Sequence, residues 1–257
     1  MKYQVGQSIT LELFGQSITL DLYAYRKNLG VKMKRDYYHD IGYKPFLFYL
    51  IFGVSAEELE VSQKRHKVDE LPEGLDIRSF TREAQGEWID GWFSGAYGSV
   101  MREADAVLFE RCKVAENCVV LQGTVKNDST LDYMRNVIGI IQAFVEKGAV
   151  GIMDPQTITL YAPEQWTERF FDQEVNAQKH VIVLYSREGE SYWLHTRGMA
   201  EFGRPDIGIS GVPEGKVDAY KLNYSWGCSY YFFLDDEFEG SGDLSDLLPV
   251  YELVFRL

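Results

Sequence analysis

The sequence is poor in cysteine, histidine and basic residues, and each shortage excludes a class of protein. Its 257 residues include three cysteines, four histidines, and 26 lysines and arginines against 39 aspartates and glutamates. An odd, small number of cysteines without a Cys-X-X-Cys pair fits neither a disulfide framework nor a cysteine zinc site, so a reducing compartment is expected. The net charge of −13 disfavours binding to nucleic acid and to anionic lipid.

Long apolar runs and familiar catalytic motifs are missing as well. The longest apolar run, Phe46 to Val54, is far shorter than the roughly 18 residues of a membrane-spanning helix. The first residues have no apolar core of a secretion signal. Phosphate-binding glycine loops, a His-Glu-X-X-His zinc motif and a Gly-X-Ser-X-Gly nucleophile turn are absent from the sequence. We therefore expect a soluble cytoplasmic protein, and no cofactor, metal or catalytic residue is predicted.

What the sequence does contain is a composition that supports a large, aromatic-rich core. Hydrophobic residues make up 46% and aromatic residues 14%. The most regular segment lies between Ser129 and Gly148, where apolar residues recur at intervals of three and four, which predicts a buried helix capped by Ser129 and Asp132. Strand-like segments flank it without a regular βαβα alternation. The predicted fold class is therefore α+β, with mixed or antiparallel sheets and a few packed helices.

Shorter elements are predicted from local patterns. Residues 55–67, capped by Ser55, are expected to be helical, and so are residues 163–171, which begin with a proline. Residues 106–114 and 118–125 are predicted to form a β-hairpin. Further strands are expected at 46–54, 149–153, 157–161, 206–210 and 228–234, with a second hairpin from 181–185 and 191–196.

The N-terminal region contains a tandem repeat. Residues 6–13 recur as residues 15–22 with a single change, from Glu12 to Asp21. Both copies alternate apolar and polar residues, which predicts two strands or one long strand. The repeat is too short for a solenoid, so we interpret it as a duplication without a functional role.

The densest group of chemically useful side chains lies between Trp193 and Asp206. On a strand, Trp193, His195 and Arg197 share one face, so the stem of Arg197 is expected to pack on Trp193. Arg204 precedes a proline in a loop and is expected to be exposed. Two guanidinium groups and an imidazole suit an anionic ligand, which makes His195, Arg197, Arg204 and Asp206 the candidate ligand-binding residues. The alternative is structural: Arg204 and Asp206 stabilise a turn, and His195 is satisfied within its strand.

The same segment carries a resemblance. His195–Met199 and Phe202–Asp206, which read HTRGM…FGRPD, resemble a signature of uncharacterised bacterial proteins whose families are known only as domains of unknown function. The resemblance covers roughly residues 118–210 and implies an α+β bacterial cytoplasmic protein without indicating a reaction. It does not extend to residues 1–105. Because no linker of low complexity interrupts the chain, we expect one compact unit or two closely packed ones, an α+β region, 1–105, packed on an α+β domain, 106–257.

The acidic stretch from Asp235 to Asp246 has carboxylates at spacings that partly match a calcium loop. The preceding residues have a strand pattern rather than a helical one, so a solvated acidic loop is the favoured interpretation.

The absence of a catalytic constellation and the acidic charge together predict a function. We expect a non-enzymatic interaction protein with a basic protein partner, similar by charge to immunity proteins that neutralise bacterial toxins. The alternative is an enzyme or a binder of a small anionic ligand that uses residues 195–206.

Overall fold

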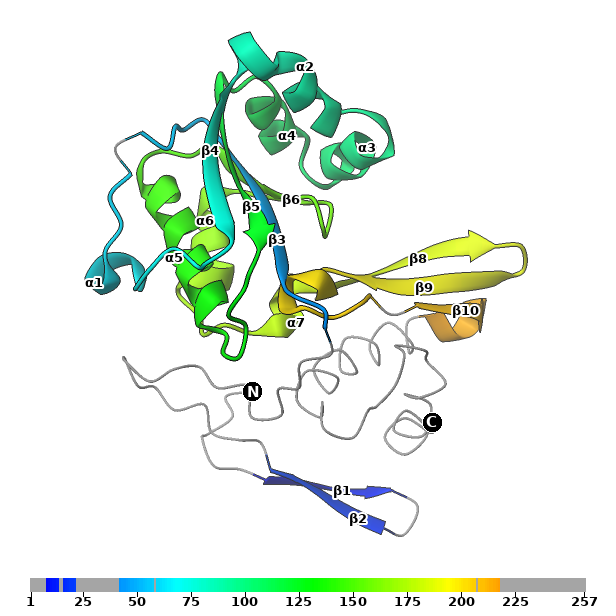
Figure 1. Cartoon of the computed structure of the whole chain (residues 1–257). Helices are drawn as coiled ribbons and strands as arrows, with labels where there is room; N and C mark the ends of the chain where they lie inside the picture. The colour runs from blue at the N-terminus through cyan, green and yellow to red at the C-terminus, as the bar shows by residue number, and fades with distance from the viewer. Residues whose placement is uncertain (1–7, 14–15, 22–41, 58, 207, 218–257) are drawn as a thin grey trace. The chain divides into compact units, whose positions relative to one another are not determined.

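The structure is a computed structural model that describes residues 8–13, 16–21, 42–57, 59–206 and 208–217. It separates into two units, residues 1–32 and 33–257 (Figure 1). The strand predicted at 228–234 and the acidic stretch from Asp235 to Asp246 lie outside the described residues.

In the first unit, the two copies of the repeat form the two strands of a hairpin. β1 (Ser8–Leu13) pairs antiparallel with β2 (Gln16–Asp21), and Thr10 faces Thr19, its counterpart in the second copy. Of the two arrangements expected from the sequence, two separate strands are the one observed.

The second unit is built on a five-stranded antiparallel sheet. Its strand order is β4-β5-β3-β6-β7, and every neighbouring pair runs antiparallel. The predicted α+β class is therefore confirmed. Strands from both sides of residue 105 pair in this one sheet, so the predicted division after that residue does not separate two sheets. The strands are β3 (Phe46–Phe52), β4 (Leu75–Thr81), β5 (Asn117–Thr124), β6 (Gly151–Asp154) and β7 (Thr159–Tyr161).

One face of this sheet is covered by the predicted long helix. Alternate residues of β3, among them Leu47 and Tyr49, pack against α5 (Asp132–Glu146) in the larger core. Gly148 ends the helix with a φ of +97°, as predicted. The predicted cap at Ser129 is wrong, because its Oγ donates to Asn127 and the helix begins later. The same core includes α6 (Pro163–Trp166) and the π-helical segment Thr167–Phe171.

The other face is covered by three consecutive helices. The intervening β3 residues, such as Leu50 and Phe52, pack against α2 (Arg82–Trp92), α3 (Gly95–Ala104) and α4 (Ala106–Lys113). The helices thus form layers on both sides of the sheet (Figure 1).

The hairpin predicted to begin at residue 106 is wrong, since its first arm is helix α4. The side chain of Asp105 caps this helix by accepting from the Leu108 amide at 2.9 Å. Leu108 and Cys112 lie on one helical face and are buried. Phe109 is fully buried as well, and positions i, i+1 and i+4 lie on one side of a helix, whereas neighbouring residues point to opposite faces of a half-buried strand.

The helix predicted at 55–67 shrinks to α1 (Gln63–His66), with Ser62 as its cap. Ser55 does not cap a helix. Its Oγ accepts a hydrogen bond from the Glu57 amide, and the Ala56 amide donates to Ser79 Oγ of β4 at 2.8 Å. These contacts hold a turn beside β4 in place of the first part of the predicted helix.

A second sheet follows α7 (Ala177–His180) and has the order β8-β9-β10. Its hairpin of β8 (Ile182–Glu188) and β9 (Ser191–Arg197) confirms the second predicted hairpin. The 3₁₀ turns Met199–Phe202 and Glu214–Lys216 flank β10 (Gly208–Pro213). We call the five-stranded sheet the large sheet and this one the small sheet.

Candidate functional site

The predicted alternation of faces along β9 is observed. Leu194 and Thr196 are fully buried, whereas Trp193 and His195 are half-buried and stack on each other, with ring centroids 4.0 Å apart. His195 thus occupies the place beside Trp193 that was expected for the stem of Arg197.

Arg197 turns towards other elements instead. Its Nε donates to the backbone oxygen of Gln156 at 2.6 Å, and its guanidinium lies 5.7 Å from the ring centroid of Tyr97 on α3. The predicted packing of Arg197 on Trp193 is therefore wrong. The arginine joins the end of the small sheet to the β6–β7 turn and to the helical layer.

Asp206 fastens the end of the same segment. Although the residue lies at the surface, its Oδ1 accepts from Thr196 Oγ1 at 3.1 Å and from the Met199 amide at 3.2 Å. Partial burial lowers the pKa of His195, and the charge of Arg197 acts in the same direction while Asp206 opposes it. The structure thus brings His195, Arg197 and Asp206 within electrostatic range of one another.

Arg204 has a different environment. It is only 2% exposed, and its Nη1 donates to the Gly203 oxygen at 2.9 Å. The expected exposure of Arg204 is therefore wrong. The reason is the course of the chain: Gly203, with a φ of +69°, brings the segment against the residues that precede β3, where an added Cβ would lie 2.9 Å from the Tyr43 oxygen.

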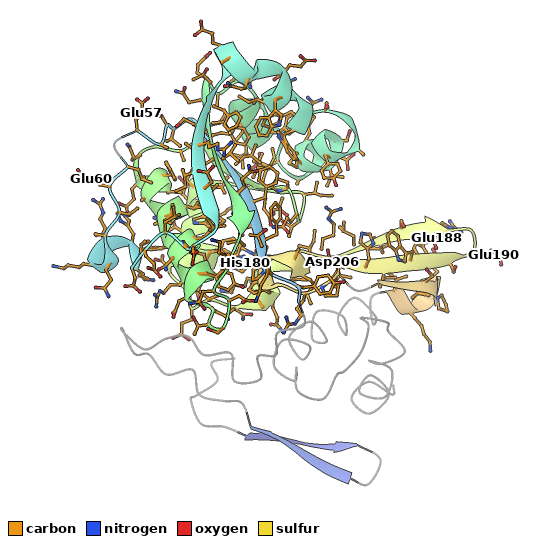
Figure 2. The ribbon with its side chains drawn as sticks, in the orientation of Figure 1. Glu57, Glu60, His180, Glu188, Glu190 and Asp206 are labelled. Atoms are coloured by element: carbon orange, nitrogen blue, oxygen red, sulfur yellow. The ribbon has the colours of Figure 1, made fainter. Side chains whose placement is uncertain are left out.

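A second group, which the sequence did not indicate, is a buried acid cluster. We use this name for Tyr49, Asp154, His180 and Glu201, which come from β3, β6, α7 and the 3₁₀ turn after β9 and are each at most 2% exposed. Figure 2 shows His180 where the small sheet joins the rest of the second unit. The sequence contains one sign of this cluster: Glu201 is an acidic residue among the apolar residues Met199, Ala200 and Phe202.

Hydrogen bonds hold both carboxyl groups of the cluster. Tyr49 donates its hydroxyl to Glu201 Oε1 at 2.7 Å, and Tyr133 donates to the Glu201 backbone oxygen at 3.0 Å. Asp154 accepts from the Thr157 hydroxyl at 2.5 Å and from the Gln156 amide at 2.8 Å, which is the side-chain chemistry of a turn.

Burial sets the protonation of this cluster. It raises the pKa of Glu201 to about 8, although the bond from Tyr49 opposes the rise. Burial, followed by the proximity of Glu201, raises the pKa of Asp154 to about 8. Burial also lowers the pKa of His180 to about 3. The cluster is therefore mainly uncharged near neutral pH. Its carboxyl groups keep their protons in the core, out of contact with solvent.

A third group lies on the surface over α2 and is called the aromatic row. It runs from the large sheet across the helix, and none of its members is fully buried. Trp88 is 39% exposed and Phe46 is 40% exposed. The row consists, in order of contact, of Phe46, Phe48, Trp92, Trp88 and Phe80.

A groove of about 320 Å³ lies beside α1 and the β4 edge of the large sheet. Its lining is mostly apolar, with Asp69 and Glu70 among the polar members, and it includes none of the four predicted ligand-binding residues. Within the described ranges, no three histidine, cysteine or acidic side chains are grouped as metal ligands would be. Over the same part of the chain, no helix is long and apolar enough to span a membrane.

Comparison of the chain with protein-family models, with curated proteins and with solved structures gives no match. The resemblance of the HTRGM…FGRPD segment to uncharacterised bacterial proteins therefore stays a prediction.

Proposed function

We propose that this chain is a non-enzymatic, cytoplasmic interaction protein whose partner is a basic protein. The observation that carries the proposal is the set of exposed carboxylates without an ion pair among the described residues. They occur on α2, on the π-helical segment and at the β8–β9 turn, so the negative charge is spread over several elements. They include Glu83, Glu87, Glu168, Glu188 and Glu190.

Uncompensated surface charge of this kind has a physical use in recognition. It contributes little to the stability of the fold, but it attracts a partner of opposite charge over several ångströms and speeds the encounter. Two cysteines, Cys112 and Cys118, are buried as free thiols, which supports the reducing location that the proposal includes.

The enzymatic alternative at residues 195–206 has less support from the contacts. An anion site needs guanidinium groups that converge on open space. Arg204 is buried, and Arg197 spends its Nε on a backbone oxygen. The buried acid cluster, which has the most perturbed pKa values, is closed to a substrate.

The proposal is tested by capture with the full-length chain as bait in native bacterial lysate, followed by purification of the captured protein. We expect a basic partner whose measured affinity falls as salt is raised, because surface charges are screened. Capture of no protein at low salt, or of acidic and neutral proteins whose affinity does not respond to salt, would contradict the proposal.

A further inference from the structure

Each ring of the aromatic row contacts the next one, and two of the rings, Phe46 and Trp88, are exposed to solvent. Phe46 and Phe48 have centroids 6.4 Å apart, and Phe48 meets Trp92 edge-on at 5.3 Å. Trp92 meets Trp88 edge-on at 5.8 Å, and Trp88 stacks on Phe80 at 4.9 Å. Although Phe80 and Trp92 both contact its ring, 39% of Trp88 remains exposed.

Trp88 differs from the other rings of this protein that are placed beside arginines. Arg102 lies 4.6 Å from the centroid of Phe109, and Arg169 lies 5.4 Å from that of Phe170. Within the described part of the chain, no cation lies over Trp88, although an indole binds cations better than either of the other aromatic side chains.

The helix that carries Trp88 also carries acidic residues. Glu83 and Glu87 lie on either side of a kink at Gln85, are exposed, and form no ion pair with any described residue. The neighbouring Asp90 is already neutralised by Arg82 at 2.6 Å. Helix α2 therefore carries two exposed carboxylates without an ion-pair partner among the described residues, and Glu87 is the sequence neighbour of the exposed Trp88.

We propose that the aromatic row, together with Glu83 and Glu87, is the surface on which the partner docks, and that the partner presents an arginine-containing segment there. This inference rests on the proposed function and names its surface. A guanidinium stacks flat on the indole of Trp88 while its N–H groups reach a carboxylate, so one side chain satisfies both features. Lysine makes the charge contact but lacks the planar stacking. Tryptophan and arginine are also among the residue types enriched at the few positions that carry most of the binding energy of an interface.

The test uses two fluorescent peptides of equal length, oligo-arginine and oligo-lysine, titrated against the full-length chain at low salt. We expect the arginine peptide to bind more tightly than the lysine peptide. Trp88→Leu, which keeps an apolar side chain, is expected to weaken the arginine peptide roughly 2- to 30-fold and to remove the difference between peptides. Trp88→Phe keeps a ring and is expected to retain part of the preference, which separates stacking from a loss of fold.

Matched controls lie on the small sheet. Glu188→Gln/Glu190→Gln removes the same charge as Glu83→Gln/Glu87→Gln, and Tyr185→Leu removes another exposed ring. The α2 double variant is expected to weaken both peptides by several-fold more than the control double variant.

Two results overturn the inference in distinguishable ways. If both peptides bind equally and the α2 variants have the same effects as their controls, the aromatic row is not the docking surface, although the partner can still be basic. If neither peptide binds while a basic protein is still captured from lysate, both the docking surface and the arginine-containing segment are contradicted. Failure of the capture experiment as well removes the proposed function.

Discussion

His180 Nδ1 and Glu201 Oε2 lie 3.1 Å apart in the interior of the second unit, yet they are not aligned as a hydrogen bond. The histidine has a lowered pKa and the glutamate a raised one, so the pair is neutral near pH 7 rather than an ion pair. His180 immediately precedes the strands of the small sheet, and Glu201 lies between β9 and β10. Their contact therefore joins the two segments that flank the hairpin of β8 and β9, and the Tyr49 hydroxyl, which donates to Glu201, links them to β3 of the large sheet.

The first prediction concerns pH. Glu201 and Asp154 keep protons in the folded state that the unfolded chain releases, because their ordinary pKa values are 4.5 and 3.8 and burial raises both to about 8. At these two groups the unfolded chain binds fewer protons between these limits, which outweighs the opposite effect of His180 below about pH 6.5, so the free energy of unfolding falls as pH rises from about 5 to about 8. Urea melts are expected to show a loss of at least about 1 kcal/mol from pH 5.5 to pH 8.

Glu201→Gln separates this effect from the general repulsion of an acidic protein, which acts in the same direction. Glutamine keeps the shape and cannot ionise, so the variant is expected to lose part of the pH dependence and to be relatively more stable at pH 8. An unchanged slope in the variant would show that Glu201 does not hold a proton in the folded state.

The second prediction concerns the donor to Glu201. Tyr49→Phe removes the hydroxyl that lies 2.7 Å from Oε1 and leaves the acceptor buried without that bond. We expect a loss of about 1 to 3 kcal/mol of stability at pH 7. Because this bond lowers the pKa of Glu201, the loss is expected to be greater at pH 8 than at pH 6. A loss that is equal at both pH values would contradict the assigned role.

The third prediction compares the two arginines of the 195–206 segment. Arg204→Ala is expected to cost about 2 to 4 kcal/mol, because the whole side chain is buried. Arg197→Ala is expected to cost about 1 kcal/mol or less, since its head is partly in water. Parallel urea melts measure both values. Equal losses would mean that the contacts of Arg197 with Gln156 and Tyr97 are worth as much as the burial of Arg204.

The fourth prediction concerns the turn that leaves β9. Gly198 has a φ of +103°, and an added Cβ would lie 2.2 Å from the backbone oxygen of His180. Gly198→Ala is therefore expected to destabilise the protein by more than about 2 kcal/mol. Gly189→Ala is the control, because Gly189 has a φ of +64° but open space around it. Its expected cost is about 1 kcal/mol, and a similar cost at both positions would show that the contact with His180 relaxes easily.

Local sequence patterns were enough to predict the elements that depend mainly on residues close together in the chain. The helix after Ser129 was predicted because its apolar residues repeat with the helical period, and this repeat is the face that the large sheet covers. The hairpin of β8 and β9 was predicted from two neighbouring strand-like segments, and Gly189 in the turn between them adopts a positive φ. The same alternation placed Trp193 and His195 on one face of β9.

Tertiary packing decided the features that need residues far apart in the chain. Residues 106–114 are apolar enough for either a strand or a helix, and the cap at Asp105 and the layer over the sheet selected the helix. Arg204 stands before a proline in a loop, which by local preference is exposed, but the turn at Gly203 carries it under the chain that precedes β3. The acid cluster joins Tyr49 to Glu201, 152 positions apart. The sequence determined the acidity and the fold class, whereas only the folded chain decided which carboxylates meet water and which keep their protons, because burial, and not residue type, sets the pKa of a carboxyl group.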